Sequence, residues 1–175
     1  NLSYFMISVS PNLGSALNSN RISYLGSVFL PFFMLMMVLR FCGMKRSKPL
    51  MITLVAVGIV MLGITTSPGI LPIYYKEVSF AVVNGVSTLV KVYGPLHPLY
   101  LVYLLGYFAA MVTVIIRAKV KKTIETTANA AILAIAVFVN IGVWLIEQLV
   151  QVDFEILSVS YIISELFLLG LYLMM

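Results

Sequence analysis

Long apolar runs separated by short polar turns dominate the pattern of hydrophobic and polar positions along the chain. A helix needs about 20 predominantly apolar residues to cross the roughly 30 Å hydrocarbon core of a bilayer. Five runs approach this requirement: residues 22–42, 50–66, 98–116, 129–149 and 156–175. An earlier apolar stretch, residues 1–17, is interrupted by serines and by Pro11, and we interpret it as the outer end of a span whose beginning is missing. The pattern predicts an all-α integral membrane bundle of about five full spans plus a partial first one.

The composition supports a membrane protein and excludes several other classes. Of the 175 residues, 62% are apolar and 10% are charged, whereas a soluble domain is roughly a quarter charged. The single Cys excludes a disulfide-stapled secreted domain, and the abundance of Val, Leu and Ile excludes a disordered chain. The chain begins with Asn1 and stops inside an apolar run. We therefore treat residues 1–175 as a single transmembrane domain, truncated at both ends, of a longer protein.

The distribution of Lys and Arg predicts the orientation of the spans. Basic residues near span ends favour the cytoplasm. If the five spans alternate in direction, eight of the 11 basic residues fall on one side: Arg40, Lys45, Arg46, Lys48, Arg117, Lys119, Lys121 and Lys122. The other side holds Arg21, Lys76 and Lys91. This count places the turns 43–49 and 117–128 and the C-terminal end in the cytoplasm, and the connection 67–97 and the turn 150–155 outside.

The external connection 67–97 contains a hairpin signal. Asn84-Gly85 stands between two runs rich in valine, and a type I′ turn needs positive φ at both of its central residues. A two-residue turn would pair Val83 with Val86, Val82 with Ser87, Ala81 with Thr88, Phe80 with Leu89, Ser79 with Val90 and Val78 with Lys91. The alternative is a short amphipathic helix at the membrane interface. The valines and the Asn-Gly pair favour the hairpin.

The sequence contains no catalytic or metal-binding motif. One His and one Cys exclude a zinc site, covalent haem attachment and a Cys–His nucleophile, and Walker, GxGxxG and HExxH motifs are absent. We expect no cofactor and no metal. The basic clusters directly follow apolar runs and are typical of span ends, so we expect no nucleic-acid partner for this segment. Such a protein binds, senses or transports rather than catalyses.

Glu165 is the strongest candidate for a functional side chain. It lies nine residues into the last predicted span, about 13.5 Å from the outer end. A carboxylate at that depth costs about 2.5–3.5 kcal/mol and should have a partner. Asn140 on the preceding span would lie at similar depth, and Trp144 and Tyr161 would line the same space. We predict an outward-facing pocket formed by these four residues. The alternative is a protonated Glu165 that only bonds one helix to the next.

His97 lies at the outer end of the predicted span 98–116. It could sense protons or anchor a ligand at the rim of the predicted pocket. The alternative, which is the more common role of such a histidine, is to cap an interfacial turn. Around it the sequence places the residues of an outer aromatic belt: Tyr74, Tyr75, Tyr93, Tyr100 and Trp144.

Two stretches resemble signatures of one known family, the N-terminal seven-helix sensor region of bacterial histidine kinases. Residues 21–35, RISYLGSVFLPFFML, resemble its first signature, and residues 93–103, YGPLHPLYLVY, are similar to the motif that begins its following helix. The resemblance implies a sensory input domain that detects an extracytoplasmic or membrane-derived signal. The last helix would relay this signal to a missing cytoplasmic output domain, a histidine kinase first and otherwise a cyclase or a DNA-binding regulator.

The resemblance also implies partners and leaves other functions open. The partners would be the lipid bilayer, a small-molecule or proton signal, and a second copy in a homodimer of the full-length protein, while this segment itself would not be an enzyme. The runner-up is a small transporter or channel subunit, which should show internal repeats and matched broken spans. No repeat is seen, and Pro31 has no symmetric counterpart. A structural assembly subunit would leave Glu165 and the hairpin without a role.

Overall fold

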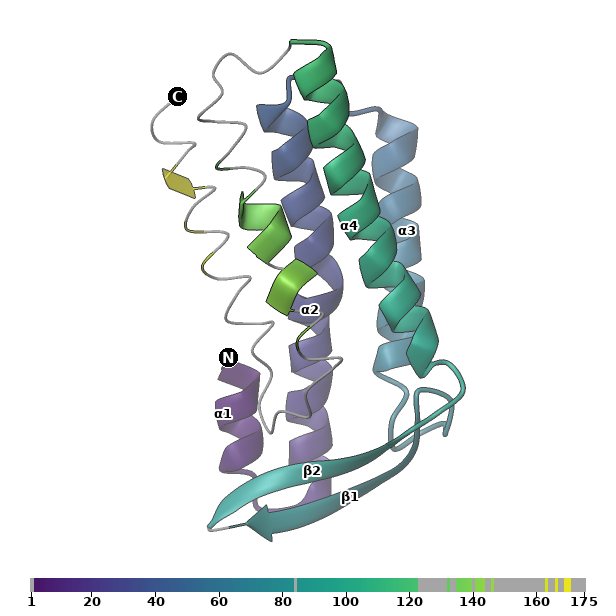
Figure 1. Cartoon of the computed structure of the whole chain (residues 1–175). Helices are drawn as coiled ribbons and strands as arrows, with labels where there is room; N and C mark the ends of the chain where they lie inside the picture. Colours follow the sequence, from purple (N-terminus) through teal and green to yellow (C-terminus); the bar gives the residue numbers. More distant parts are fainter. Residues whose placement is uncertain are drawn as a thin grey trace. The chain divides into compact units, whose positions relative to one another are not determined.

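The computed structural model describes residues 2–83 and 85–122 and, beyond them, residues 132, 135–139, 141–143, 146, 163, 166, 169 and 170. The chain order of the elements is α1 (Leu2–Ser8), α2 (Leu13–Phe41), α3 (Lys48–Thr65), β1 (Tyr75–Val83), β2 (Val86–Tyr93) and α4 (His97–Val120) (Figure 1). In this part of the chain, three helices are long and apolar enough to cross a membrane, namely α2, α3 and α4. The described fold is therefore mostly helical with one small antiparallel sheet.

The first three predicted spans coincide with these helices. The helices α3 and α4 agree closely with the runs 50–66 and 98–116, whereas α2 begins at Leu13 rather than at residue 22. The runs 129–149 and 156–175 fall largely outside the described residues, so a bundle of five full spans remains a prediction.

The structure differs from our interpretation of residues 1–17 as the end of one span. This stretch divides into the short helix α1 and the first turns of α2. The Ser10 hydroxyl donates to the Met6 carbonyl at 2.7 Å and helps to end α1. The Asn12 side chain then accepts a hydrogen bond of 2.9 Å from the Ser15 N–H and caps the N-terminus of α2. The polar residues that interrupt this apolar stretch are thus the residues that separate two helices.

The helix α2 is longer than the predicted span, because polar turns precede its apolar part. Its 29 residues measure about 43 Å at 1.5 Å per residue, which exceeds the roughly 30 Å of a hydrocarbon core. Its first turns contain Ser15, Asn18 and Arg21 and are therefore suited to the polar interface. The apolar remainder corresponds to the predicted span 22–42.

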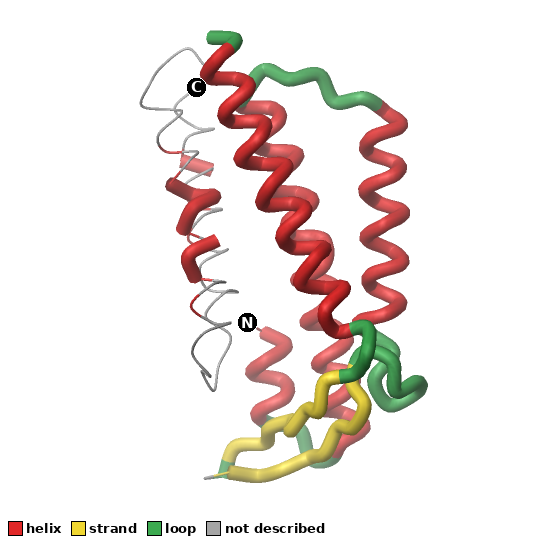
Figure 2. The backbone as a smooth tube through the Cα atoms, turned by 45° about the vertical axis from the view of Figure 1, so that its right-hand side comes forward, coloured by secondary structure: helices red, strands yellow, loops and turns green. Residues whose placement is uncertain are grey.

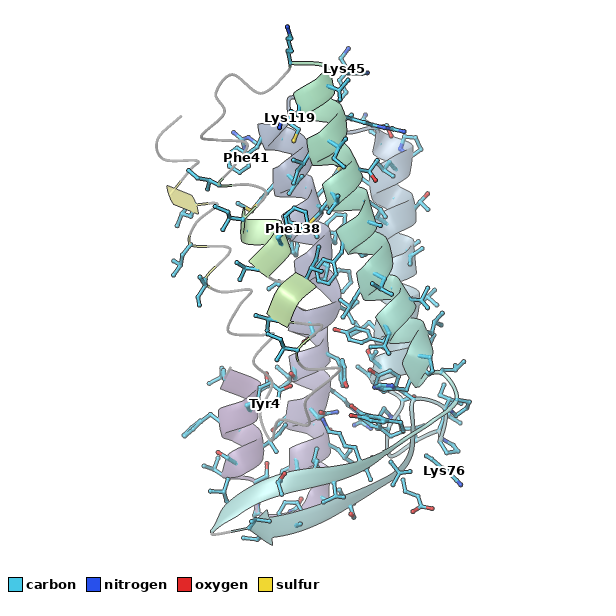
Figure 3. All side chains as sticks on the ribbon, viewed as in Figure 1. Tyr4, Phe41, Lys45, Lys76, Lys119 and Phe138 are labelled. Atoms are coloured by element: carbon cyan, nitrogen blue, oxygen red, sulfur yellow. The ribbon has the colours of Figure 1, made fainter. Side chains whose placement is uncertain are left out.

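The chain divides into two compact units. The first comprises Asn1–Phe29 and Ile52–Leu104, and the second Leu30–Met51 and Leu105–Met175. Within the second unit, the end of α2, the start of α3 and the end of α4 lie at the same end (Figure 2). Lys45 and Lys119 both project there (Figure 3). This placement agrees with the grouping of the basic clusters on one side.

The predicted hairpin is confirmed in the first unit. Strands β1 and β2 are antiparallel, and all six expected pairs occur, from Val83 with Val86 to Val78 with Lys91. The turn contains Gly85 with φ of 79°, a value that few residues other than glycine adopt readily. The alternative of an interfacial helix is therefore wrong.

A β-bulge at Lys76 interrupts the base of the hairpin. Glu77 pairs with Val92, and the next pair in the ladder is Tyr75 with Tyr93, so Lys76 is an extra residue in β1. An extra residue reverses the alternation of side chains between the two faces of a strand.

The bulge changes the face on which Tyr75 lies. Strict alternation from Val78 would place Tyr75 on the opposite face, whereas the bulge returns it to the face of Val78 and Lys91. Accordingly, Tyr75 is only 4% exposed. The Lys91 Nζ lies 5.4 Å from the centroid of its ring, within the range of a cation–π interaction.

Two hydrogen bonds fix the ends of the hairpin. The Ser87 hydroxyl of β2 donates to the Ser10 carbonyl at 2.7 Å, so the strand lies against the segment between α1 and α2 (Figure 1). At the base, the Gly94 N–H donates to the Tyr74 carbonyl at 2.8 Å. A Cβ on Gly94 would lie 2.5 Å from the Ile73 carbonyl oxygen. Glycine is therefore required where the chain leaves the hairpin and begins α4.

Candidate functional site

Aromatic side chains from α2, the hairpin and α4 meet in the first unit, and we call them the aromatic cluster. The cluster consists of Tyr24, Tyr74, Tyr75, Tyr93, His97 and Tyr100. Tyr74 is 1% exposed, and Tyr24 and Tyr75 are also buried. Tyr93 lies at the surface, so the cluster reaches from the interior of this unit to its exterior.

The ring of Tyr74 packs between α2 and α4. It meets Tyr24 edge-to-face at 5.4 Å and Tyr100 edge-to-face at 6.4 Å. Tyr24 and Tyr100 also contact each other edge-to-face at 6.0 Å. Aromatic pairs prefer this geometry, because the positive edge of one ring meets the negative face of another. The three rings therefore form a closed set in which each contacts the other two.

A buried hydrogen bond joins the Tyr24 and Tyr75 hydroxyls. A hydroxyl removed from water needs a partner, and each of these two supplies the other. The bond joins α2 to β1 directly. It also depends on the bulge at Lys76, since the bulge places Tyr75 on the face of the hairpin that carries Val78 and Lys91.

His97 belongs to the cluster rather than standing alone at the surface. Its ring stacks on Tyr93 with centroids 3.9 Å apart and lies 5.3 Å from Tyr74. Its backbone N–H donates to the Gly94 carbonyl at 3.2 Å, in the turn that leads into α4. The other predicted site residues lie outside the described part of the chain: Asn140, Trp144, Tyr161 and Glu165.

Both stretches that resemble the histidine-kinase sensor region contribute to the cluster. The first supplies Tyr24, and the second supplies Tyr93, His97 and Tyr100. A family model described as the N-terminal 7TM region of histidine kinase matches residues 1–173. The chain belongs to this family. Neither the comparison with curated proteins nor the comparison with solved structures gave a match.

Membership of the family gives the general role of the chain. The 7TM region of histidine kinases is a membrane-embedded sensory input region for signal transduction and is not itself the catalytic domain. The apolar helices α2, α3 and α4 suit that location. The family therefore favours a sensor over the transporter or structural subunit considered above.

In this 7TM region, the cluster also compensates for a proline in α2. Pro31 has no N–H, so the Ser27 carbonyl lacks the helical donor that residue 31 would otherwise supply. The Tyr100 hydroxyl of α4 donates to this Ser27 carbonyl at 3.3 Å. The Tyr103 hydroxyl, which lies outside the cluster, adds a bond of 2.7 Å to the neighbouring Val28 carbonyl. Freed backbone groups in membrane helices are commonly satisfied by neighbouring helices in this way.

Arg21 joins α2 to the segment that follows α3. Its Nε donates to the Thr66 carbonyl at 3.2 Å and its Nη2 to the Pro68 carbonyl at 3.0 Å. Its Nη1 donates to the Asn18 side chain at 2.8 Å. Both backbone carbonyls lie just beyond the C-terminus of α3, where the helix dipole favours a cation.

The sequence identified most members of the cluster without showing that they pack together. An aromatic belt was expected from Tyr74, Tyr75, Tyr93 and Tyr100, and the structure brings these four together with Tyr24 and His97. Tyr24 and the anchoring role of Arg21 were missed. Both residues lie in the stretch 21–35, which resembles a signature of the family, and this position was the available signal that they contribute to the site.

The bond to Ser27 can be tested with a double-mutant cycle. We expect Tyr100→Phe to lower the free energy of unfolding by about 1 kcal/mol, because it leaves the Ser27 carbonyl without a donor. In a Pro31→Ala background the loss should fall by more than half, since an alanine at this position restores the helical N–H. The measurement is reversible unfolding in mixed micelles.

Tyr93→Phe is the matched control for this cycle. Its ring stacks on His97 at the surface, so removing its hydroxyl should leave the free energy of unfolding unchanged. An equal loss for Tyr100→Phe with and without Pro31 would show that the hydroxyl does not compensate for the proline.

Proposed function

We propose that this 7TM region detects an extracytoplasmic or membrane-derived signal and relays it through its last helix to a cytoplasmic histidine kinase domain. The aromatic cluster is the observation that carries this proposal. It joins the hairpin, which is the largest element between the described spans, to both α2 and the first turns of α4. We expect the full-length protein to act as a homodimer.

The contacts of the cluster support a mechanical link from the hairpin to the helices. Close-packed interiors transmit displacement rather than absorbing it, and Tyr74 is almost fully buried between α2 and α4. The chain passes from β2 into α4 through residues 94–96, and the Gly94 and Leu96 N–H groups both bond back to the base of the hairpin. A displacement of the hairpin would therefore move the outer ends of the helices, and shifts of about 1–2 Å are common in such switches.

The proposal requires the hairpin to lie outside the cell. The support is the basic-residue count, in which eight of 11 Lys and Arg residues lie in the turns and span ends assigned to the cytoplasm. The same assignment places the C-terminal end of the region in the cytoplasm, where an output domain would follow.

Cysteine labelling tests this orientation. In a Cys42→Ala background, an impermeant thiol reagent applied to intact cells should modify Ser79→Cys in the hairpin and leave Ser47→Cys unmodified. Both serines are exposed in the structure, so the two variants are matched in accessibility. Permeabilised cells should label both, and the reverse pattern in intact cells would contradict the orientation.

We further propose that a signal acts between the last two predicted spans at Glu165, with Asn140, Trp144 and Tyr161 around it. The support is energetic, because a carboxylate near the middle of a membrane is costly without a partner. A ligand or proton that changes how Glu165 is satisfied would bias the position of the last helix.

Glu165→Gln separates a signalling role from a structural one. Gln keeps the shape and hydrogen-bonding capacity of Glu but fixes the neutral state. If the charge carries the signal, autophosphorylation of the full-length kinase should lock high or low while thermal stability stays near that of the parent. Glu155→Gln, the same change in the predicted outer turn, should have no effect. Unchanged output in Glu165→Gln would leave Glu165 a structural contact.

A further inference from the structure

A groove of about 250 Å³ lies in the first unit beside the aromatic cluster. It runs between the first turns of α2, the connection after α3 and the start of β1. Its walls are mainly apolar and include Leu13, Leu17, Ile70, Leu71, Pro72 and Val78. Tyr75 also lines it, so the groove and the cluster share one side chain.

The outer wall of the groove exposes unusually apolar side chains. Ile70 is 72% exposed and Leu71 is 53% exposed. Neighbouring exposed apolar side chains around a concavity are typical of a binding surface. A bound apolar group would cover them.

Gly69 keeps the inner part of the groove open. Its φ is 81°, and a Cβ at this position would lie 2.9 Å from Leu17 Cδ1 and 3.8 Å from Arg21 Nη2. A side chain here would therefore fill the space beside Leu17. The same distances place the Arg21 guanidinium next to the groove.

The charges around the groove favour an anion. The hydrogen bonds of Arg21 all go to neutral oxygens, and within the described part of the chain its guanidinium forms no ion pair. Lys76 lines the groove and extends from the base of the hairpin away from the strands (Figure 3). Among the residues that the structure describes, Glu77 is the single acidic member of the lining, so Arg21, Lys76 and Glu77 together carry a net positive charge. A concave site of one sign raises the local concentration of ligands of the opposite sign.

We propose that this groove binds a single-chain amphiphilic anion. The alkyl chain lies along Leu17 and Ile70, and the carboxylate lies at the rim beside Lys76, in the positive potential to which Arg21 contributes. The volume suits one chain of medium length and is too small for a phospholipid with two acyl chains. The inference rests on the proposed sensory function, since the bound chain would contact Tyr75 and so act on the aromatic cluster.

Calorimetric titration of decanoate into the protein in nanodiscs of zwitterionic lipid tests the proposal, with empty nanodiscs subtracted. We expect saturable binding. Ile70→Ser should weaken it about tenfold, because it removes apolar contact with the chain. Lys76→Gln should weaken it about threefold, as expected for the loss of one exposed ion pair.

Two variants match these changes outside the groove. Val86→Ser replaces an exposed apolar residue at the hairpin turn, and Lys45→Gln removes one positive charge from a different turn. Both should bind decanoate like the parent. Decanol, which has the chain without the charge, and acetate, which has the charge without the chain, should each bind at least about tenfold more weakly than decanoate.

Several results would overturn the proposal. These are heat no greater than that of empty nanodiscs, parent affinity in both Ile70→Ser and Lys76→Gln, or equal affinity for decanol. Displacement of decanoate by phosphatidylglycerol in the nanodisc would assign the groove to a membrane lipid instead. All of these results concern ligand binding to the groove alone. The sensory function is tested separately, by the labelling and autophosphorylation experiments.

Discussion

The hydrogen bond between Tyr24 and Tyr75 is the interaction on which the packing of the hairpin against the helices depends. It joins the second helix to the first strand across 51 residues of sequence, inside a set of rings that also includes Tyr74 and Tyr100. Buried hydroxyls need hydrogen-bonding partners, so displacing either tyrosine removes a hydrogen bond from the other. Two local features support this contact. The bulge at Lys76 places Tyr75 on the required face of the hairpin, and Gly94 lets the chain after β2 pass close to the Ile73 carbonyl at the base of the hairpin.

A second constraint comes from the membrane, where each backbone polar group needs a partner within the protein. The polar side chains of the described region largely meet this need. Asn12 caps α2, Arg21 binds carbonyls beyond α3, and Tyr100 occupies the carbonyl freed by Pro31. The groove beside the aromatic cluster adds to this pattern the cation Lys76, which lies in its lining.

The sequence predicted those parts of the fold that are governed by local rules. Three spans follow from runs of apolar residues, and the hairpin register follows from the Asn-Gly turn and the two-residue period of a strand. The bulge could not be predicted in the same way, because a single extra residue at Lys76 leaves no trace in composition yet moves Tyr75 to the other face. The start of α2 was missed because its first turns are polar, and the Asn12 cap is local chemistry that a search for apolar spans overlooks.

The candidate site was predictable only in part for a related reason. Aromatic residues near span ends indicate a belt, but their packing into a cluster depends on contacts between distant segments. Tyr24 and Tyr100 meet although one lies in the second helix and the other beyond the hairpin. The predicted pocket around Glu165 is argued only from the depth of this residue in the membrane and from the free-energy cost of a carboxylate there. It lies outside the part of the chain that the structure describes.

The most direct test of the account is a double-mutant cycle on the hydroxyl pair, with autophosphorylation of the full-length kinase as the readout. If the pair couples the hairpin to the helices, Tyr24→Phe and Tyr75→Phe should each change the output in the same direction by about fivefold. The double variant should change it no further, because both substitutions remove one shared bond, and Tyr93→Phe should leave the output unchanged. Unaltered output in both single variants and in the double variant, accompanied by a loss of thermal stability, would contradict the account and leave the cluster a purely structural contact.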